Sequence, residues 1–410
     1  MVEEGAHSPG LGERAVNVES GVASAVAAAV DPDEVLRFAR ALVTTPSENP
    51  GGTEDAVAEV VVGILEGIGA DARIVRGEAG RPSVVARIGD GSRPRLAWNG
   101  HLDVVPAGDP GTWSHPPFAA EVVDGRLVGR GAADMKGPVA SALAAVAAIR
   151  RSGVRLGGTI DLHLVADEEL TGLNGTKVLL EQSFLDQDAA IVGEPTDLRL
   201  MLAERGGAWV RAIARGRAAH GSTPQLGVNA ITSMARFLLR IEEVLPDLEH
   251  PLVGRPSVNA AIIEGGSAPN VVPDTCVVDV DRRVVPGETD PAAVLEPFER
   301  LARAITRDHP EVDLSFDLHL WTDAAEADPD SEISRVCRAA MRAETGRTTE
   351  DSGLTGITDA RFYLNDAGVQ AVLLGPGSLT VAHTADEWVA VEDLVTASRI
   401  YARVFAAFCA

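Results

Sequence analysis

TIDLHLVADEE, residues 159–169, is the stretch that decides the fold, because a short apolar run ends in three consecutive acids. Three more apolar runs are bounded by Gly, Pro or Asp, namely RLAW (95–98), AAIV (189–192) and AVLL (371–374). Such short, bounded runs are typical of buried strands. An Ala-rich segment, about 137–151, lies between RLAW and TIDLHLVA and predicts a long helix. Strands that alternate with helices indicate an α/β layered domain.

The stretch 206–320 has a different pattern. Its strand–helix–strand–strand–helix–strand order, βαββαβ, is that of the ferredoxin-like split βαβ unit. The expected elements are strands 208–215, 257–263, 276–285 and 312–319 with helices 228–244 and 291–307. The candidate site residues described below come from 101–194 and again from 383, so we expect this α+β unit to be an insertion. The predicted domains are a loose N-terminal leader (1–30), a discontinuous catalytic domain (31–205 and 321–410) and an inserted domain (206–320).

Composition excludes several classes of function. The chain has 410 residues, more than one domain usually needs. Its formal net charge of −24 makes nucleic acid and anionic membranes poor candidates as partners, because both attract basic patches. Cys276, Cys337 and Cys409 have no metal-ligand spacing, which indicates reduced thiols in a cytoplasmic protein. No apolar run approaches the length of about 20 residues that a membrane helix needs, and Glu3 and Glu4 stand where a signal peptide carries positive charge.

Polar side chains follow all four strands of the α/β domain. NGHLD comes after RLAW, DEE after TIDLHLVA, GEPT after AAIV, and GPGSLTVAHTADE after AVLL. Open α/β sheets place their ligands at the carboxyl ends of the strands. The residues with acid–base or ligand chemistry at these ends are His101, Asp103, Glu168, Glu169, Glu194 and His383. We therefore expect them to meet in one site at one edge of the sheet.

Spacing indicates roles for some of these residues. Side chains at i and i+2 of an extended backbone point the same way, so Asp103 could accept a hydrogen bond from the ring nitrogen of His101 that does not bind metal. The alternative is a solvent-exposed turn. Glu168 and Glu169 point in different directions, which favours one metal ligand and one base over two solvated loop acids. Asp134, in the glycine-rich loop GRGAADMKG, is either a carboxylate that bridges two cations or an ordinary helix cap.

Eight motifs in order along the chain resemble the M20 metallopeptidase family, which contains acetylornithine deacetylase, succinyl-diaminopimelate desuccinylase, aminoacylase and glutamate carboxypeptidase types. The resemblance runs from about residue 33 to the C-terminus, and the order of several long motifs makes it specific. It implies a zinc-exopeptidase-like mixed sheet with helices on both faces, and a lid or dimerisation role for the inserted domain. The motifs are GHLDVVP (100–106), GRGAADMKG (129–137), ADEELTGLNGT (166–176), VGEPT (192–196), RGRAAHGSTP (215–224), GGSAPNVVPD (265–274), DRRVVPGE (281–288) and GITDARF (356–362).

The resemblance implies a site for two Zn²⁺ per subunit. His101 and Glu194 would hold one zinc, Glu169 and His383 the other, and Asp134 would bridge them. These ligand types suit zinc, with Co²⁺ or Mn²⁺ as possible substitutes. The family has Glu at the Glu194 position in deacylases and carboxypeptidases and usually Asp in aminopeptidases. The substrate implied is therefore an N-acylated amino acid.

Catalytic roles also follow from the resemblance. Glu168 would act as general base and acid, so that a metal-bound hydroxide attacks the amide carbonyl and the proton passes to the leaving amine. Asp103 would support His101. His220, in AAHGSTP, matches the family's histidine that reaches the oxyanion from the partner subunit's small domain. We therefore expect a homodimer that forms through the inserted domain.

Four more residues are expected to contact the substrate. Arg283 matches the family's clamp for the substrate α-carboxylate, a role that suits a bidentate guanidinium, and Asn270 matches a neighbouring contact. Gly356 and Thr358, in GITDAR, resemble the family's substrate-contacting loop. The implied function is a di-zinc amidohydrolase of deacetylase, desuccinylase or carboxypeptidase type. Two alternatives stay open: an aminopeptidase or dipeptidase on the same scaffold, and a non-hydrolytic relative that only binds a metal or a metabolite.

Overall fold

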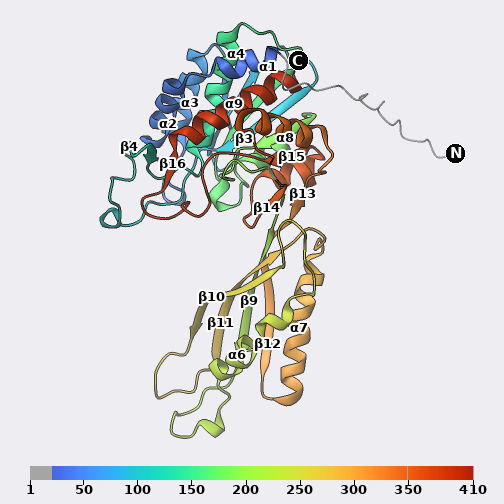
Figure 1. The fold of residues 1–410 in the computed structure, drawn as a ribbon. Helices are drawn as coiled ribbons and strands as arrows, with labels where there is room; N and C mark the ends of the chain where they lie inside the picture. Colours follow the sequence, from blue (N-terminus) through green and yellow to red (C-terminus); the bar gives the residue numbers. More distant parts are fainter. Residues whose placement is uncertain (1–20, 349, 410) are drawn as a thin grey trace, which may run out of the picture.

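The computed structural model describes residues 21–348 and 350–409. Figure 1 shows a larger part, in which helices cover a mixed sheet, and an elongated part built on a second sheet. None of the helices in the described ranges combines the length and the apolar character that crossing a membrane requires.

Within the described residues, the larger sheet has nine strands in the order β1-β2-β6-β3-β7-β15-β8-β13, and β14 pairs with β8. The consecutive strands β6, β3, β7 and β15 run parallel to one another. They coincide with the four apolar runs of the sequence, so the predicted α/β class is confirmed. The bounds are β1 (Asp71–Arg76), β2 (Pro82–Ile88), β3 (Arg95–His101), β6 (Thr159–Val165), β7 (Ala189–Val192), β8 (Met201–Glu204), β13 (Ala325–Glu326), β14 (Ser352–Leu354) and β15 (Gln370–Leu373).

Side chains of the central strands alternate between two cores. Leu96 and Trp98 of β3 belong to the core on one face, and Ala97 belongs to the core on the other. Because both faces are covered, these strands appear in the sequence as continuous apolar runs. The helices of this part are α1 (Gly21–Ala28), α2 (Pro32–Val43), α3 (Asp55–Gly67), α4 (Lys136–Ser152), α5 (Thr176–Glu181), α8 (Glu332–Thr345) and α9 (Val391–Phe408).

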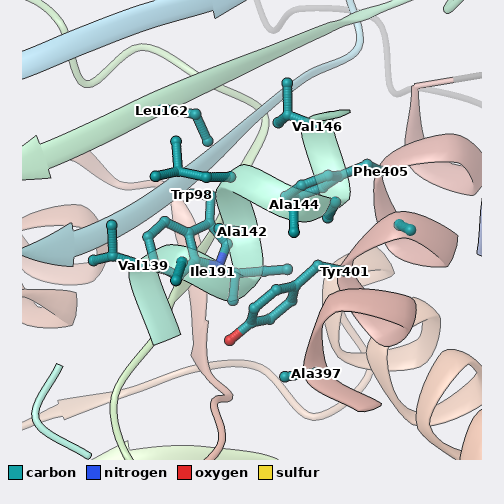
Figure 2. Close-up of a cluster of buried hydrophobic side chains, with 14 of the residues drawn as sticks. Trp98, Val139, Ala142, Ala144, Val146, Leu162, Ile191, Ala397, Tyr401 and Phe405 are labelled. Carbon is teal, nitrogen blue, oxygen red and sulfur yellow. The ribbon is translucent and has the colours of Figure 1, made fainter. Parts of the chain in front are cut away.

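Helix α4 is the Ala-rich helix that the sequence predicts, and its residues 136–149 are all buried. Alanines of α4 belong to the same apolar cluster as Trp98 of β3 and Tyr401 of α9 (Figure 2). The two aromatic rings meet edge to face, with centroids 5.7 Å apart. Small side chains let the helix pack closely against the sheet and α9, which explains the composition of this segment. The packing also fixes the start of α4, where Asp134 lies.

The expected loose leader over residues 1–30 is wrong for residues 21–30. Helix α1 packs against α9 and α4, and its Ala23 and Val26 are fully buried. The small apolar side chains of this segment fit the surface that α9 offers, and burial there removes them from water. Residues 1–20 lie outside the described residues.

The second sheet has four antiparallel strands in the order β10-β11-β9-β12, with α6 and α7 packed on one face. Along the chain the elements follow the βαββαβ order expected from the sequence. The helix expected over 228–244 is shorter, because α6 ends at Leu238 and a 3-10 turn follows. The bounds are β9 (Gly206–Arg215), α6 (Ala230–Leu238), β10 (Ser257–Gly265), β11 (Thr275–Val284), α7 (Pro291–Asp308) and β12 (Asp313–Thr322). A separate three-stranded sheet pairs β16 (Trp388–Ala390), β5 (Arg126–Val128) and β4 (Glu121–Val123).

Candidate metal centre

The carboxyl ends of the central strands bring the expected residues together. His101 is the last residue of β3, Glu168 and Glu169 come shortly after β6, and Glu194 comes shortly after β7. His383 lies in the loop that follows β15. Both glutamates after β6, with Glu194 and His383, line one cavity of about 580 Å³. The convergence expected from the strand ends is therefore present in the fold.

Asp134, just before α4, lies between the two histidines. Its Oδ1 is 2.9 Å from Nε2 of His101, and its Oδ2 is 3.4 Å from Nε2 of His383. Nε2 of His383 is also 3.1 Å from Oε2 of Glu169. Each oxygen of one buried carboxylate thus faces a different histidine, which is the arrangement that a carboxylate bridging two cations requires.

The donor set fits divalent cations. His101, Glu168 and Glu194 place one possible ligand atom each within 4.8 Å of one another, and so do His101, Asp134 and Glu169. Oε1 of Glu194 is buried and has no hydrogen-bond partner. Because a buried carboxylate oxygen without a partner is costly, this atom indicates a ligand position. Imidazole and carboxylate groups are the ligands that Zn²⁺ and similar ions accept.

The electrostatics also indicate a need for positive charge. Burial, together with neighbouring acids, raises the pKa values of Glu168 and Glu194 well above the usual range. Burial opposes ionisation of Asp134 too, but hydrogen bonds with His101 and His383 hold its pKa below its usual range. Burial lowers the pKa of His101, and the contact with Asp134 outweighs this effect, so the pKa lies well above that of a free imidazole. The raised pKa values of His101 and His383 show that this group of buried acids favours positive charge beside it.

Asp103 does not act as the sequence suggested. Nδ1 of His101 donates to the backbone carbonyl oxygen of Asp103 at 2.8 Å, whereas the carboxylate oxygen Oδ1 is 3.6 Å away. The carboxylate of Asp103 accepts instead from the backbone N–H groups of Glu168 and Glu169, both at 3.2 Å, and from Nδ2 of Asn49 at 2.9 Å. The i, i+2 rule fails here because the chain leaves extended geometry after His101. A carbonyl oxygen can only accept, so Nδ1 carries the hydrogen and Nε2 is the nitrogen available to a metal.

Glu387 is a site residue that sequence reasoning missed. Its Oε1 accepts the backbone N–H groups of Ala133 at 2.9 Å and Asp134 at 3.0 Å, and Nη1 of Arg130 donates to its Oε2. Glu387 is fully buried. It therefore holds the loop that presents Asp134. Its only sequence signal is the short distance from His383 along the chain.

Asp359 and Glu204 add two more buried acids that the sequence analysis did not single out. Oγ1 of Thr176 donates to Oδ2 of Asp359 at 2.6 Å, and Oδ1 of Asp359 is buried without a partner. Burial raises the pKa of Asp359 to about 6 and that of Glu204 to about 8. The hydroxyl of Thr358 donates to Oε2 of Glu204. Thr358 and Gly356 both line the cavity, but the Thr358 hydroxyl is already engaged with Glu204.

Arg283 reaches the same cavity from β11. Its side chain is 31% exposed, and its Nε lies 3.0 Å from Oδ2 of Asp281. Its neighbour Arg282 is buried and pairs with Glu288, as alternation along a strand predicts. The guanidinium of Arg283 is therefore the one of the two that a molecule in the cavity can contact.

His220 and Asn270 do not line this cavity. His220 lies in the loop after β9, is exposed, and its Nδ1 is 2.7 Å from Oγ of Ser222. The backbone N–H of Gly221 donates to the carbonyl oxygen of Asn270 at 2.8 Å, so the two expected site residues lie on neighbouring segments. Within one chain they stand apart from the metal centre, and the sequence pattern alone could not show this.

Comparisons with known proteins agree with the expected family. Residues 97–407 match the model of the family described as peptidase family M20/M25/M40. A succinyl-diaminopimelate desuccinylase from Methylobacterium radiotolerans is 36% identical over 405 residues, covering 92% of this chain and 97% of the relative. A probable succinyl-diaminopimelate desuccinylase from Staphylococcus epidermidis is 30% identical over 406 residues, covering 91% and 97%. An acetylornithine deacetylase from Myxococcus xanthus is 34% identical over 336 residues, covering 80% and 83%.

Solved structures share the fold. Human carnosine dipeptidase 1 gives a TM-score of 0.75 at 19% identity and covers 95% of this chain and 99% of that one. An M20 family metallo-carboxypeptidase from Sulfolobus solfataricus gives 0.77 at 18% identity, covering 92% and 99%. At these identities the likeness concerns the mixed α/β fold.

Proposed function

This chain belongs to peptidase family M20/M25/M40 and is a metal-dependent hydrolase of amide bonds, and on that premise we propose that it removes the acyl group from N-acylated amino acids at a centre of two divalent cations. The observation that supports this most strongly is the position of Asp134, whose two oxygens face two different histidines. In the proposed reaction one water molecule adds across the amide. The C–N bond breaks, and a carboxylate and a free amine leave.

We propose that His101 and Glu194 hold one cation, that Glu169 and His383 hold the other, and that Asp134 bridges them. The unpaired oxygen of Glu194 and the 3.1 Å contact between His383 and Glu169 support this division. Zn²⁺ is the expected ion, since the ligands are imidazoles and carboxylates. Cations at these ligands would lower the pKa of a water molecule and polarise the amide carbonyl.

Glu168 is the proposed general base. Its Oε2 lies 4.0 Å from Nε2 of His101, so the carboxylate borders the cation position. Burial raises its pKa, which makes the ionised form a stronger base. Glu168 takes the proton from the attacking water and delivers it to the nitrogen of the leaving amine. Asp103 positions it by holding its backbone N–H.

Arg283 is the proposed clamp for the substrate α-carboxylate. Asp281 occupies its Nε, which leaves the Nη groups to donate to a carboxylate. Gly356 and Thr358 also line the cavity, where Thr358 is proposed to act by shaping the loop. A substrate held at Arg283 would present its amide to the metal centre.

His220 is proposed to act across a homodimer interface, with Asn270 beside it. The inserted domain, 206–320, would provide that interface through β10, an edge strand on which Ile262 and Ile263 are 56% and 58% exposed. Exposed apolar edge strands pair readily with a second chain. His220 of the partner subunit would then supply a hydrogen-bond donor to the oxyanion of the tetrahedral intermediate.

The proposed function is tested by hydrolysis assays on zinc-loaded protein with N-acetyl, N-succinyl and N-formyl amino acids and with unblocked dipeptides. We expect cleavage of acyl amino acids and loss of nearly all activity in Glu168→Gln. Glu59→Gln, an exposed glutamate of α3, is the matched control and should keep wild-type rates. Cleavage of the dipeptides alone would favour a dipeptidase. No cleavage of any substrate by protein that binds two zinc ions would favour a non-hydrolytic relative.

A further inference from the structure

The cavity beside the metal centre has a largely apolar wall. Leu170, Trp209 and Leu379 line it with side chains that are 46%, 48% and 38% exposed. Leu320 and Ile357 add half-buried apolar surface. Single exposed apolar side chains need no explanation, but several that meet in one cavity indicate a surface that binds a ligand.

Trp209 lies on the strand next to the proposed carboxylate clamp, and Leu320 lies on the strand beyond it. In the register of the second sheet, Trp209 is opposite Leu320 of β12, and Gly207 is opposite Arg283 of β11. Directly opposed residues of antiparallel strands point to the same face. Trp209, Leu320 and Arg283 therefore share the face that α6 and α7 leave open. An amino acid with its α-carboxylate at Arg283 would place its side chain, one carbon away, against Trp209 and Leu320.

Among the described residues, the cavity has no free acid in its lining for a substrate ammonium group. Its acidic lining residues, all in the described part of the chain, are Asp134, Glu168, Glu169 and Glu194. These four carboxylates belong to the metal centre, where two dications would balance their charge. Asp281, next to the wall, is paired through its Oδ2 with the guanidinium of Arg283, and its Oδ1 is buried away from solvent without a hydrogen-bond partner. An ammonium group on the substrate side chain would be desolvated without a partner, which is unfavourable.

The cavity also has no spare cation for a second carboxylate. Besides the proposed ligand His383, its positively charged lining residues are Arg283 and Arg361. Arg361 is buried, and its Nη groups donate to the backbone carbonyl oxygens of Thr358 and Thr171. With Arg283 engaged by the α-carboxylate, an acyl group that ends in a carboxylate finds no cationic partner among the described residues of this chain that line the cavity.

Resting on the proposed function, we infer that the preferred substrate is an N-acyl amino acid with an apolar or aromatic side chain and an uncharged acyl group, and that Trp209 and Leu320 are specificity-determining residues. The site would discriminate against substrates with a second ammonium or a second carboxylate. The discrimination arises from unpaired charge, which separates substrates more strongly than a difference of one methylene group.

The first test compares kcat/KM of the zinc-loaded protein for N-acetyl-L-methionine, N-acetyl-L-phenylalanine, N²-acetyl-L-ornithine and N-succinyl-L,L-diaminopimelate. We expect the apolar pair to exceed both charged substrates by about 100-fold or more. A preference for either charged substrate would overturn the inference and leave the proposed function intact. No hydrolysis of any of the four would count against the proposed function itself.

Leu320→Glu provides a gain-of-function test, because a carboxylate on the wall would give a substrate ammonium a partner. We expect the ratio of kcat/KM for N²-acetyl-L-ornithine over that for N-acetyl-L-methionine to rise at least about tenfold. A folding defect would lower both values alike, whereas an unchanged ratio in a variant whose circular dichroism matches the wild type would contradict the assignment of Leu320. Calorimetric binding of both substrates to Glu168→Gln proteins, with and without Leu320→Glu, gives a second readout that does not depend on turnover.

Leu170 and Leu173 form a matched pair for the apolar wall. Both are exposed leucines of one segment, but Leu173 does not line the cavity. We expect Leu170→Ala to raise KM for N-acetyl-L-phenylalanine about tenfold and Leu173→Ala to leave it within about twofold. Equal effects of the two substitutions on KM would contradict the assignment of Leu170 to the apolar wall of the cavity.

Discussion

The carboxylate of Asp103 accepts the backbone N–H of Glu168, with Oδ1 3.2 Å from the amide nitrogen. Its second oxygen accepts the N–H of Glu169 at the same distance. One fully buried acid therefore fixes the backbone of both the proposed base and a proposed metal ligand. We propose that Asp103 positions them and contacts neither cation nor substrate.

Asp103→Asn keeps one acceptor oxygen and turns the other into a donor, so one of these N–H groups loses its partner. We expect kcat to fall about 10- to 100-fold, in line with the loss of other residues that orient metal ligands. KM should change little, because Asp103 does not line the cavity. Steady-state kinetics measure both constants, and circular dichroism checks the fold. A raised KM at unchanged kcat would contradict the positioning role.

Mixed dimers test the proposal that His220 acts on the partner's site. Glu168→Gln and His220→Ala should each be nearly inactive alone. In a dimer of one subunit of each kind, one site combines an intact Glu168 with an intact His220 from the Glu168→Gln subunit. We therefore expect mixing, after subunit exchange, to restore activity to roughly a quarter of the wild-type level for random pairing.

The control for mixed dimers is the double variant Glu168→Gln/His220→Ala mixed with His220→Ala, which contains no complete site in either arrangement. Hydrolysis of N-acetyl-L-methionine is followed before and after mixing. Light scattering of tagged subunits verifies that the subunits exchange. If the mixture of Glu168→Gln and His220→Ala then shows no gain in activity over this control, His220 does not act across the interface.

The raised pKa of the buried Glu204 carboxyl group predicts that the stability of the fold depends on pH. Burial raises its pKa from 4.5 to about 8 in the folded chain. Between these values the unfolded state has released the proton that the folded state still holds. The free energy of unfolding therefore falls as pH rises from about 4.5 to 8. The loss is on the order of a few kcal/mol, since one pKa unit corresponds to about 1.4 kcal/mol.

Glu204→Gln removes this contribution, because an amide stays neutral and can still accept the hydroxyl of Thr358. We expect its Tm to be close to that of the wild type at pH 5 and several degrees higher at pH 8, by scanning calorimetry. Glu59→Gln should follow the wild type at every pH. If the Tm values of wild type and Glu204→Gln changed with pH in parallel, Glu204 would not keep its proton in the folded state.

Much of the metal centre was predictable because it depends on local patterns. An apolar run that ends in acids marks a strand whose carboxyl end reaches the site, and this placed Glu168, Glu169 and Glu194 correctly in space. Glu387 and Glu204 were missed because each acts through contacts with residues far away in the chain. Their sequence surroundings are ordinary.

The other differences between the expectations from sequence and the structure also have physical causes. The i, i+2 rule holds only for extended backbone. It fails for Asp103 because the chain turns where β3 ends, at His101. The sequence of 21–30 predicts a loose leader because no local pattern in it identifies α9, far away along the chain, as its packing partner. A sequence motif also does not state which subunit a residue serves, so His220 remained a proposal about a second chain.

Titration of chelator-treated, metal-free protein with Zn²⁺, while hydrolysis of N-acetyl-L-methionine is followed, tests the catalytic centre of two cations. We predict that activity rises from near zero and levels off at two equivalents per chain. Glu168→Gln should bind the same two equivalents, measured by elemental analysis after dialysis, and stay inactive. Full activity in the metal-free protein, or a plateau of activity at one equivalent of Zn²⁺, would contradict a centre of two cations.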